Sequence, residues 1–176
     1  MHQYSRSSQL DDFKDADHLC VTRRRSSGTS LRANRFLLSL SSPFMCKMIC
    51  GDFSECNAPR LELEDVAAGA YSDVMDLWCG KDVLGDKPLC AVMTMASVAD
   101  RLGMTEVGTV LEDAIIGQLS VDVCGDVLMG SVGLGLGRVE AVARGLALER
   151  FEEVAGTEGF MRMDEGAVGV SWTTTR

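Results

Sequence analysis

The sequence predicts an α+β fold in which a mixed part of strands and helices is followed by an all-helical part. Short alternating or β-rich runs occur only before residue 65, and no convincing strand follows Gly103. The composition, with 46% hydrophobic and 24% charged residues, is typical of a globular protein. A chain of 176 residues is long enough for one domain with a core or for two small layers.

Three stretches of the first part favour strands. Residues 17–22 and 29–33 flank the turn-like segment 23–28, and together they predict a hairpin. Residues 60–64 alternate strictly between apolar and charged side chains, which predicts a half-exposed strand. Residues 1–14 are polar and predict a loose arm or a partial helix.

Two short helices are expected between the second and third strands. Residues 36–40 form a short apolar run that predicts the first helix. Ser42 followed by Pro43 is a favourable N-cap and first turn, so a second helix is expected to start there and to end at Gly51.

Two longer helices complete the mixed part. Asp65 is expected to cap a helix that runs through Trp78 and stops at Gly80. Residues 89–102 are apolar almost all round, which predicts a central helix closed by Gly103.

The remaining residues predict helices only, over about 105–118, 121–130 and 138–154, with a short one near 164. Thr109 and Glu112 have the spacing of a capping box, although a start near Thr105 fits equally well. Four glycines between residues 130 and 137 do not have the spacing of a nucleotide-binding loop. We expect them to loosen a helix end or to permit a close helix contact.

Charge and histidine content narrow the classes of function. The formal net charge of −9 disfavours nucleic acids and anionic membranes as partners, because both bind concentrated positive charge. The histidines are His2 and His18, and no nucleophile–base pair can be assigned, so we expect no catalytic residues and no enzyme activity.

The seven cysteines predict neither a disulfide framework nor a metal centre. Cys46 and Cys50 are four residues apart and Cys56 follows, but a fourth zinc ligand is missing at any standard spacing. We therefore expect small apolar side chains in or near a core, with no cofactor and no bound metal. The other cysteines are Cys20, Cys79, Cys90 and Cys124.

No stretch of the sequence has the pattern of a signal peptide or a membrane span. Apolar runs without charge reach about a dozen residues, fewer than the roughly 20 that a membrane-spanning helix needs. The expected location is cytoplasmic or nuclear, not secreted.

Five segments of the mixed part form a recognisable pattern: residues 33–39, 42–55, 60–66, 71–80 and 96–104. Through these segments the mixed part resembles a BTB (POZ) domain. The most characteristic of them is the run from Ser42-Pro43-Phe44 to Phe53-Ser54-Glu55, which matches the family's signature without gaps. The resemblance implies a cluster of helices flanked by a small sheet.

The helical part resembles the beginning of a BACK module, the helical partner of BTB in Kelch-type adaptors. The segments that carry this likeness are residues 119–124, 141–146, 151–154 and 160–163. The expected organisation is a flexible arm over 1–14, a BTB/POZ-like domain over 15–104 and a partial BACK-like module over 105–176.

The resemblance implies a non-enzymatic protein-interaction module, often an adaptor that links a substrate protein to a cullin-3 ubiquitin ligase. In such adaptors the cullin docks on the loop after the Ser42-Pro43 helix, through a hydrophobic-x-Glu pattern that Phe53 and Glu55 match. Met48 and Ile49 would support this contact from the helix beneath.

Two alternatives remain. The chain could be a scaffold that forms a homodimer or a BTB heterodimer, since Arg35 together with Asp15 or Asp17 matches the charged pair of the family's dimer interface. It could also be a fragment of a larger BTB-BACK protein. No substrate-recognition repeat is visible, so a complete adaptor would need another chain, and the substrate protein is unknown.

Overall fold

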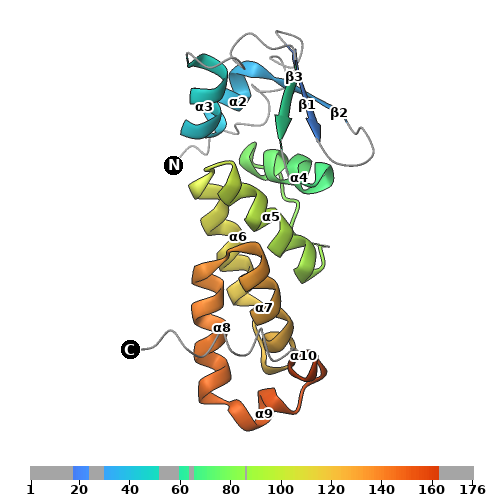
Figure 1. Ribbon diagram of the computed structural model, residues 1–176, viewed down its shortest axis with the longest axis vertical. Helices are drawn as coiled ribbons and strands as arrows, with labels where there is room; N and C mark the ends of the chain where they lie inside the picture. The colour runs from blue at the N-terminus through green and yellow to red at the C-terminus, as the bar shows by residue number, and fades with distance from the viewer. Residues whose placement is uncertain (1–17, 24–29, 52–59, 64–65, 86, 163–176) are drawn as a thin grey trace, which may run out of the picture. The chain divides into compact units, whose positions relative to one another are not determined.

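The computed structural model describes residues 18–23, 30–51, 60–63, 66–85 and 87–162. The chain divides into two compact units. Unit 1 comprises Met1–Lys87 with Thr94–Gly108, and unit 2 comprises Pro88–Met93 with Thr109–Arg176. Strands are seen only in unit 1 within the described residues (Figure 1).

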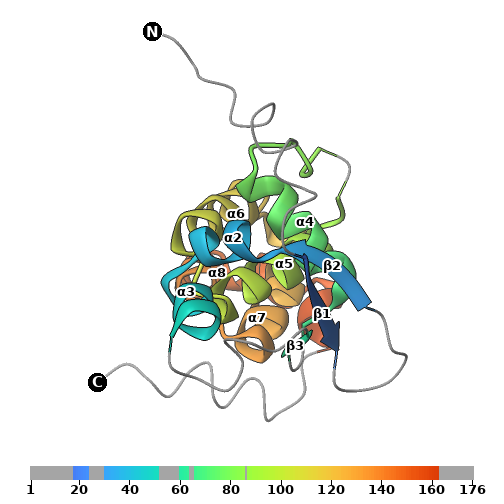
Figure 2. The same ribbon diagram turned by 90° about the horizontal axis from the view of Figure 1, so that it is seen from above.

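Unit 1 contains a three-stranded sheet in the order β2-β1-β3 (Figures 1 and 2). Strands β1 (His18–Arg23) and β2 (Ser30–Asn34) are antiparallel, with Leu19 opposite Ala33. Strand β3 (Arg60–Leu63) pairs in parallel with β1. A parallel pair needs a crossover connection, and two helices lie in the chain between β2 and β3. The strands lie where the alternation and turn patterns predict them.

Two short capped helices follow β2. In α2 (Arg35–Ser41), the side chain of Asn34 accepts a hydrogen bond of 3.1 Å from the backbone N–H of Leu37. In α3 (Pro43–Cys50), Ser42 accepts a hydrogen bond of 3.0 Å from the N–H of Met45. The N-cap predicted at Ser42 is therefore confirmed, and α3 ends at Gly51 as expected.

Helix α4 (Ala68–Trp78) corrects one expectation. Its N-cap is Ala67, which makes no side-chain hydrogen bond, so the cap predicted at Asp65 is wrong, and Asp65 itself lies outside the described residues. The C-terminal end is as predicted, because Gly80 has a φ of 86° and terminates the helix in the left-handed region that glycine tolerates.

Helix α5 (Leu89–Arg101) is buried over most of its length, as its apolar sequence predicts. Gly103, with a φ of 66°, closes it. Within unit 1 the fully buried large side chains come from four helices and the turn after α5; they are Leu38, Met45, Val74, Met95 and Leu102.

Unit 2 is all-helical over its described residues and contains most of α6 (Thr105–Gly117), α7 (Val121–Leu134), α8 (Gly137–Glu149), α9 (Phe151–Ala155) and α10 (Glu158–Met161). Helix α6 begins at Thr105, which confirms the alternative start. The start predicted from a capping box at Thr109 is wrong.

Two further helix boundaries differ from the prediction. The single helix expected over 138–154 is broken at Arg150, which caps both α8 and α9. A short helix occurs at Glu158–Met161, whereas the one expected near residue 164 falls outside the described residues. Local periodicity continues through Arg150, so it could not reveal this break.

Glycines allow α7 to pack closely in unit 2. A Cβ at Gly125 would lie 2.4 Å from the backbone nitrogen of Phe160, so only glycine lets α10 approach α7 this closely. Gly135, with a φ of 75°, ends α7. Gly135 thus confirms the helix end expected of the glycine-rich region, although α7 runs to Leu134 and not to about 130; the close backbone approach is at Gly125, outside that region.

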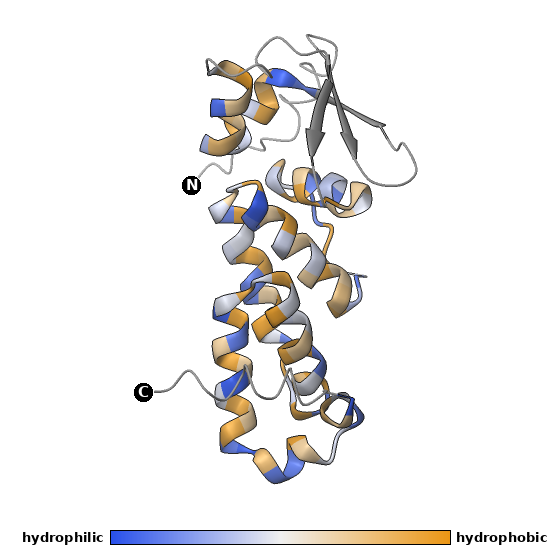
Figure 3. Cartoon of the chain, viewed as in Figure 1, coloured by the Kyte–Doolittle hydropathy of each residue, from blue (hydrophilic) through white to orange (hydrophobic). Residues whose placement is uncertain are grey.

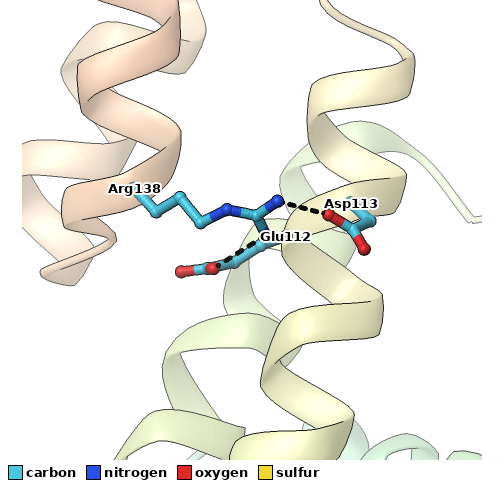
Figure 4. Close-up of polar contacts among 3 residues, drawn as sticks. All are labelled: Glu112, Asp113 and Arg138. Atoms are coloured by element: carbon cyan, nitrogen blue, oxygen red, sulfur yellow. Dashed lines mark hydrogen bonds and ion pairs between the residues drawn. The ribbon is translucent and has the colours of Figure 1, made fainter.

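Helices α6 and α8 are joined by an exposed ion-pair cluster in unit 2. The Arg138 guanidinium donates to Asp113 at 2.6 Å and to Glu112 at 3.4 Å (Figure 4). Asp113 is the main cause that raises the pKa of Arg138 above its ordinary value. Hydrophobic and hydrophilic residues are interspersed along α7 and α8 (Figure 3).

Candidate protein-interaction surface

Helices α2 and α3 bury one face and expose large apolar side chains on another. Leu38 and Met45 are fully buried, whereas Phe36 is 58%, Leu40 56% and Phe44 45% exposed. A helix of seven or eight residues has too few positions on its inward face to bury every apolar side chain of this segment. Exposed aromatic and leucine side chains that lie close together are typical of protein–protein contacts.

A groove of about 420 Å³ adjoins these helices within unit 1. Its walls come from the α2–α3 junction, the last residue of α4 and the turn that leads into α6. The lining residues are Ser39, Leu40, Ser41, Ser42, Pro43, Trp78, Gly103, Met104, Thr105, Glu106 and Val107. The groove thus combines apolar walls with hydroxyl groups, a composition that suits a polypeptide segment.

The groove offers little chemistry beyond binding. Its one titratable side chain is Glu106, which lies in the first turn of α6. The hydroxyl of Ser41 donates to the carbonyl of Leu38 at 2.7 Å, and the Ser42 hydroxyl accepts from Met45 at the start of α3. The hydroxyls of these two serines are therefore engaged by the helices.

The described part of the chain contains some of the residues expected from the sequence. Met48 is half-buried on α3, and Ile49 is only 6% exposed, so Ile49 packs inside unit 1. Arg35 is the first residue of α2 and is half-buried. The other four, Phe53, Glu55, Asp15 and Asp17, lie outside the described residues.

Sequence reasoning missed the groove and the exposed residues beside it. The sequence places Leu40 in a short apolar run and Trp78 at the end of a helix, and neither pattern predicts a groove. Trp78 lines the groove from the end of α4. The sequence does contain one signal, because α2 and α3 have more apolar residues than such short helices can bury. This excess does not tell which of the residues stay exposed.

A second hollow, of about 560 Å³, lies in unit 2 beside the start of α7. Its lining is acidic, with Asp122, Asp126, Glu153 and Glu158 together with Arg162. The hydrogen bond and charge of Arg150 lower the pKa of the exposed Glu153.

Among the described residues no group of three or more His, Cys, Asp or Glu side chains is placed to hold a metal ion. Nor is any described helix long and apolar enough to cross a membrane.

Comparison with known proteins defines the class of protein. Residues 8–119 match the model of the BTB/POZ domain, and the chain belongs to this family. The resemblance seen in the sequence is thereby confirmed.

Particular relatives are Kelch-like proteins. Kelch-like protein 30 of Homo sapiens is 30% identical over 137 residues, which cover 77% of this chain and 23% of that protein. Kelch-like protein 3 of Bos taurus is 28% identical over 67 residues, or 38% of this chain and 11% of that protein. The chain therefore spans less than a quarter of the length of these relatives. Family and relatives together support a protein-interaction role of the adaptor kind.

Proposed function

We propose that this chain is a non-enzymatic adaptor module that docks a cullin-3-type scaffold and helps to bring a substrate protein to a ubiquitin ligase. Membership of the BTB/POZ family, together with the likeness to Kelch-like proteins, carries the proposal. The substrate partner is bound by another chain or by a further domain, and a BACK-like helical module over residues 105–176 completes the docking region.

The proposed docking segment begins on α3. Half-buried Met48 lies close to the C-terminal end of this helix, and buried Ile49 anchors the helix beneath it. The helix ends at Gly51, two residues before Phe53. In this proposal Phe53 supplies an apolar anchor and the Glu55 carboxylate fixes the orientation of the partner.

Titration calorimetry of the chain against a cullin-3 N-terminal domain tests this role. We expect a dissociation constant in the micromolar range or below, about −8 kcal/mol or stronger. Phe53→Ala removes the anchor and should weaken binding by at least about tenfold, a cost of roughly 1.4 kcal/mol or more. Met48→Ala should weaken it less.

A matched control separates docking from general destabilisation. Met75, on α4, is half-buried as Met48 is, so Met75→Ala removes a comparable methionine outside both the α3 segment and residues 105–176. Binding by this variant should equal that of the unmodified chain. No heat from a folded chain, or equal binding by Phe53→Ala, would exclude the proposed docking mode.

The exposed face of α2 and α3 favours a second candidate function, self-association as a scaffold. Leu40 and Phe44 are large, apolar and about half-exposed, and Arg35 at the start of α2 matches the charged pair of the family's dimer interface. Burying such side chains against a second BTB domain would stabilise a homodimer or heterodimer.

Light scattering after size-exclusion chromatography tests the scaffold. Leu40→Asp and Arg35→Glu should each convert an associated chain to a monomer while cullin binding persists. Leu148→Asp is the matched control, because Leu148 is 58% exposed on α8 of unit 2. A mass that stays that of the oligomer in Leu40→Asp would show that this face does not mediate association.

A further inference from the structure

Two cysteines share the outward face of α3. Cys46 and Cys50 are four residues apart in this helix, and both are exposed. Each directly follows a buried residue, Met45 or Ile49, which fixes the side of the helix that faces the core. Side chains four residues apart lie on the same helix face, with Cβ atoms about 5–6 Å from each other. The two thiols are therefore neighbours at the surface.

The backbone that carries the two thiols is already ordered by its own hydrogen bonds. The N–H of Cys46 donates to the carbonyl of Ser42 at 2.9 Å, and Gly51 closes the helix by donating to Lys47 at 3.0 Å. The Ser42 side chain caps the first turn. A ligand that joins the two thiols would fix only their side-chain rotamers, so the entropic cost of binding is small.

The spacing suits a soft metal ion. A sulfur–metal bond of about 2.3 Å in tetrahedral geometry places two thiolate sulfurs about 3.8 Å apart. Rotation about the Cα–Cβ bonds brings sulfurs on Cβ atoms about 5–6 Å apart to this separation. Thiolates select soft and borderline cations over magnesium or calcium.

We propose that Cys46 and Cys50 form a two-thiolate binding site for a thiophilic divalent cation of the Zn²⁺ and Cd²⁺ class. Two sulfur–metal bonds form, the hydrated ion releases all but two of its water molecules, and the two thiol protons pass to solvent, without any change of oxidation state. In this site water fills the tetrahedral positions that the two thiolates leave open. This site is open, unlike a closed structural zinc centre.

The other described cysteines lack this arrangement. Cys79 and Cys90 have no cysteine four residues before or after them in the sequence, and Cys124 is buried. A single thiolate cannot chelate. Cys90, exposed on α5, therefore provides a matched control for a surface thiol with no second cysteine one helical turn away.

The experiment titrates the full-length chain with Cd²⁺ under a thiol-free reductant. The readouts are the ultraviolet sulfur-to-cadmium charge-transfer absorption and the heat of binding. We expect one ion per chain, displaced by Zn²⁺ in competition. Cys46→Ser and Cys50→Ser should each weaken binding by roughly hundredfold, because the second thiolate binds at a high effective concentration. Cys90→Ser should bind as the unmodified chain does.

Three results would overturn the site. Undiminished binding by Cys46→Ser or Cys50→Ser would show that the ion binds elsewhere. Saturation at one ion per two chains would show that the thiols bridge molecules instead of chelating within one helix. A loss in Cys56→Ser as large as that in Cys46→Ser would require a third thiolate. Far-ultraviolet circular dichroism of each variant shows that the fold is retained, which is expected because both thiols are exposed.

Discussion

The short helices of unit 1 and the longer helices of unit 2 are stabilised in different ways. Helices α2 and α3 have seven and eight residues, and each begins with a side-chain cap, Asn34 or Ser42. Helices α7 and α8 have 14 and 13 residues, and neither has a side-chain hydrogen bond at its N-cap. Their contacts are tertiary, as at Gly125, where α10 packs closely against α7.

This difference shows where each helix obtains its stability. A short helix makes few internal hydrogen bonds, so a satisfied N–H group at its start is a large share of its stability. A longer helix with a buried face is stabilised mainly by packing, and its ends can remain without a side-chain cap. Helices α2 and α3 also carry exposed apolar residues, which are available to a partner.

The largest effect is expected at the close contact of unit 2. Gly125→Ala would place a Cβ 2.4 Å from the backbone of Phe160, and backbone cannot move aside cheaply. We expect a loss of roughly 2 kcal/mol or more in the free energy of unfolding, measured by urea denaturation. Gly133→Ala, in the same helix but with open space around it, should instead stabilise by about 0.5–1 kcal/mol. Equal effects of the two changes would contradict the packing argument.

The second-largest effect on the free energy of unfolding is expected at the N-caps, where α3 of unit 1 is compared with α7 of unit 2. Ser42→Ala removes the hydroxyl that accepts from Met45 and should cost about 1 kcal/mol of unfolding free energy. Ser120 is the N-cap of α7 and makes no such hydrogen bond, so Ser120→Ala should cost only a few tenths of a kcal/mol. Thermal unfolding followed by circular dichroism measures both. A larger cost at Ser120 would reverse the comparison.

A smaller effect concerns a buried hydroxyl of unit 1. Tyr71 is 4% exposed, and its hydroxyl has no hydrogen-bond partner among the described residues. Tyr71→Phe keeps the ring and removes this unsatisfied group, so we expect an unchanged stability or a gain of up to about 1 kcal/mol. Chemical denaturation at neutral pH measures it, and a loss of stability would contradict the assignment.

The buried Tyr71 should also make the free energy of unfolding depend on pH. Burial raises the pKa of Tyr71 above its ordinary value, and the folded chain therefore holds the proton more tightly than the unfolded chain. The stabilisation of the folded chain by protonated Tyr71 is fully present below a pH of about 10. It is lost as the pH rises further. Burial raises the pKa of the Cys124 thiol as well. The stability of unit 2 should therefore also fall at alkaline pH. Tyr71→Phe should flatten the loss of stability above that pH.

The smallest effect is expected at the exposed ion-pair cluster. Arg138 is half-exposed and pairs with Asp113 and Glu112 at the surface of unit 2. Arg138→Gln should lower the melting temperature less than Ser42→Ala does, because solvent screens such pairs. Raising the salt concentration should shrink the difference between the two chains further. A large effect that is insensitive to salt would show that Arg138 contributes through packing.

Several local features could be read from the sequence. The Ser42-Pro43 start of α3, the ends of helices at Gly80 and Gly103 and the position of strand β3 are all as predicted. Each depends on residues within about one helical turn or one strand of each other, and backbone sterics and local hydrogen bonds are enough to decide them. Family membership could also be inferred, since the signature around Ser42 is contiguous.

Other features depend on residues that are distant in the chain. The break at Arg150, the contact of Gly125 with Phe160, and the groove that joins Leu40, Trp78 and Met104 each require knowledge of which helices meet. Hydrophobic patterning states that a side chain prefers burial, but the available area on neighbouring helices decides which side chains obtain it. For this reason the sequence by itself determined the elements and the family, whereas only the tertiary structure decided that Leu40 and Phe44 remain exposed.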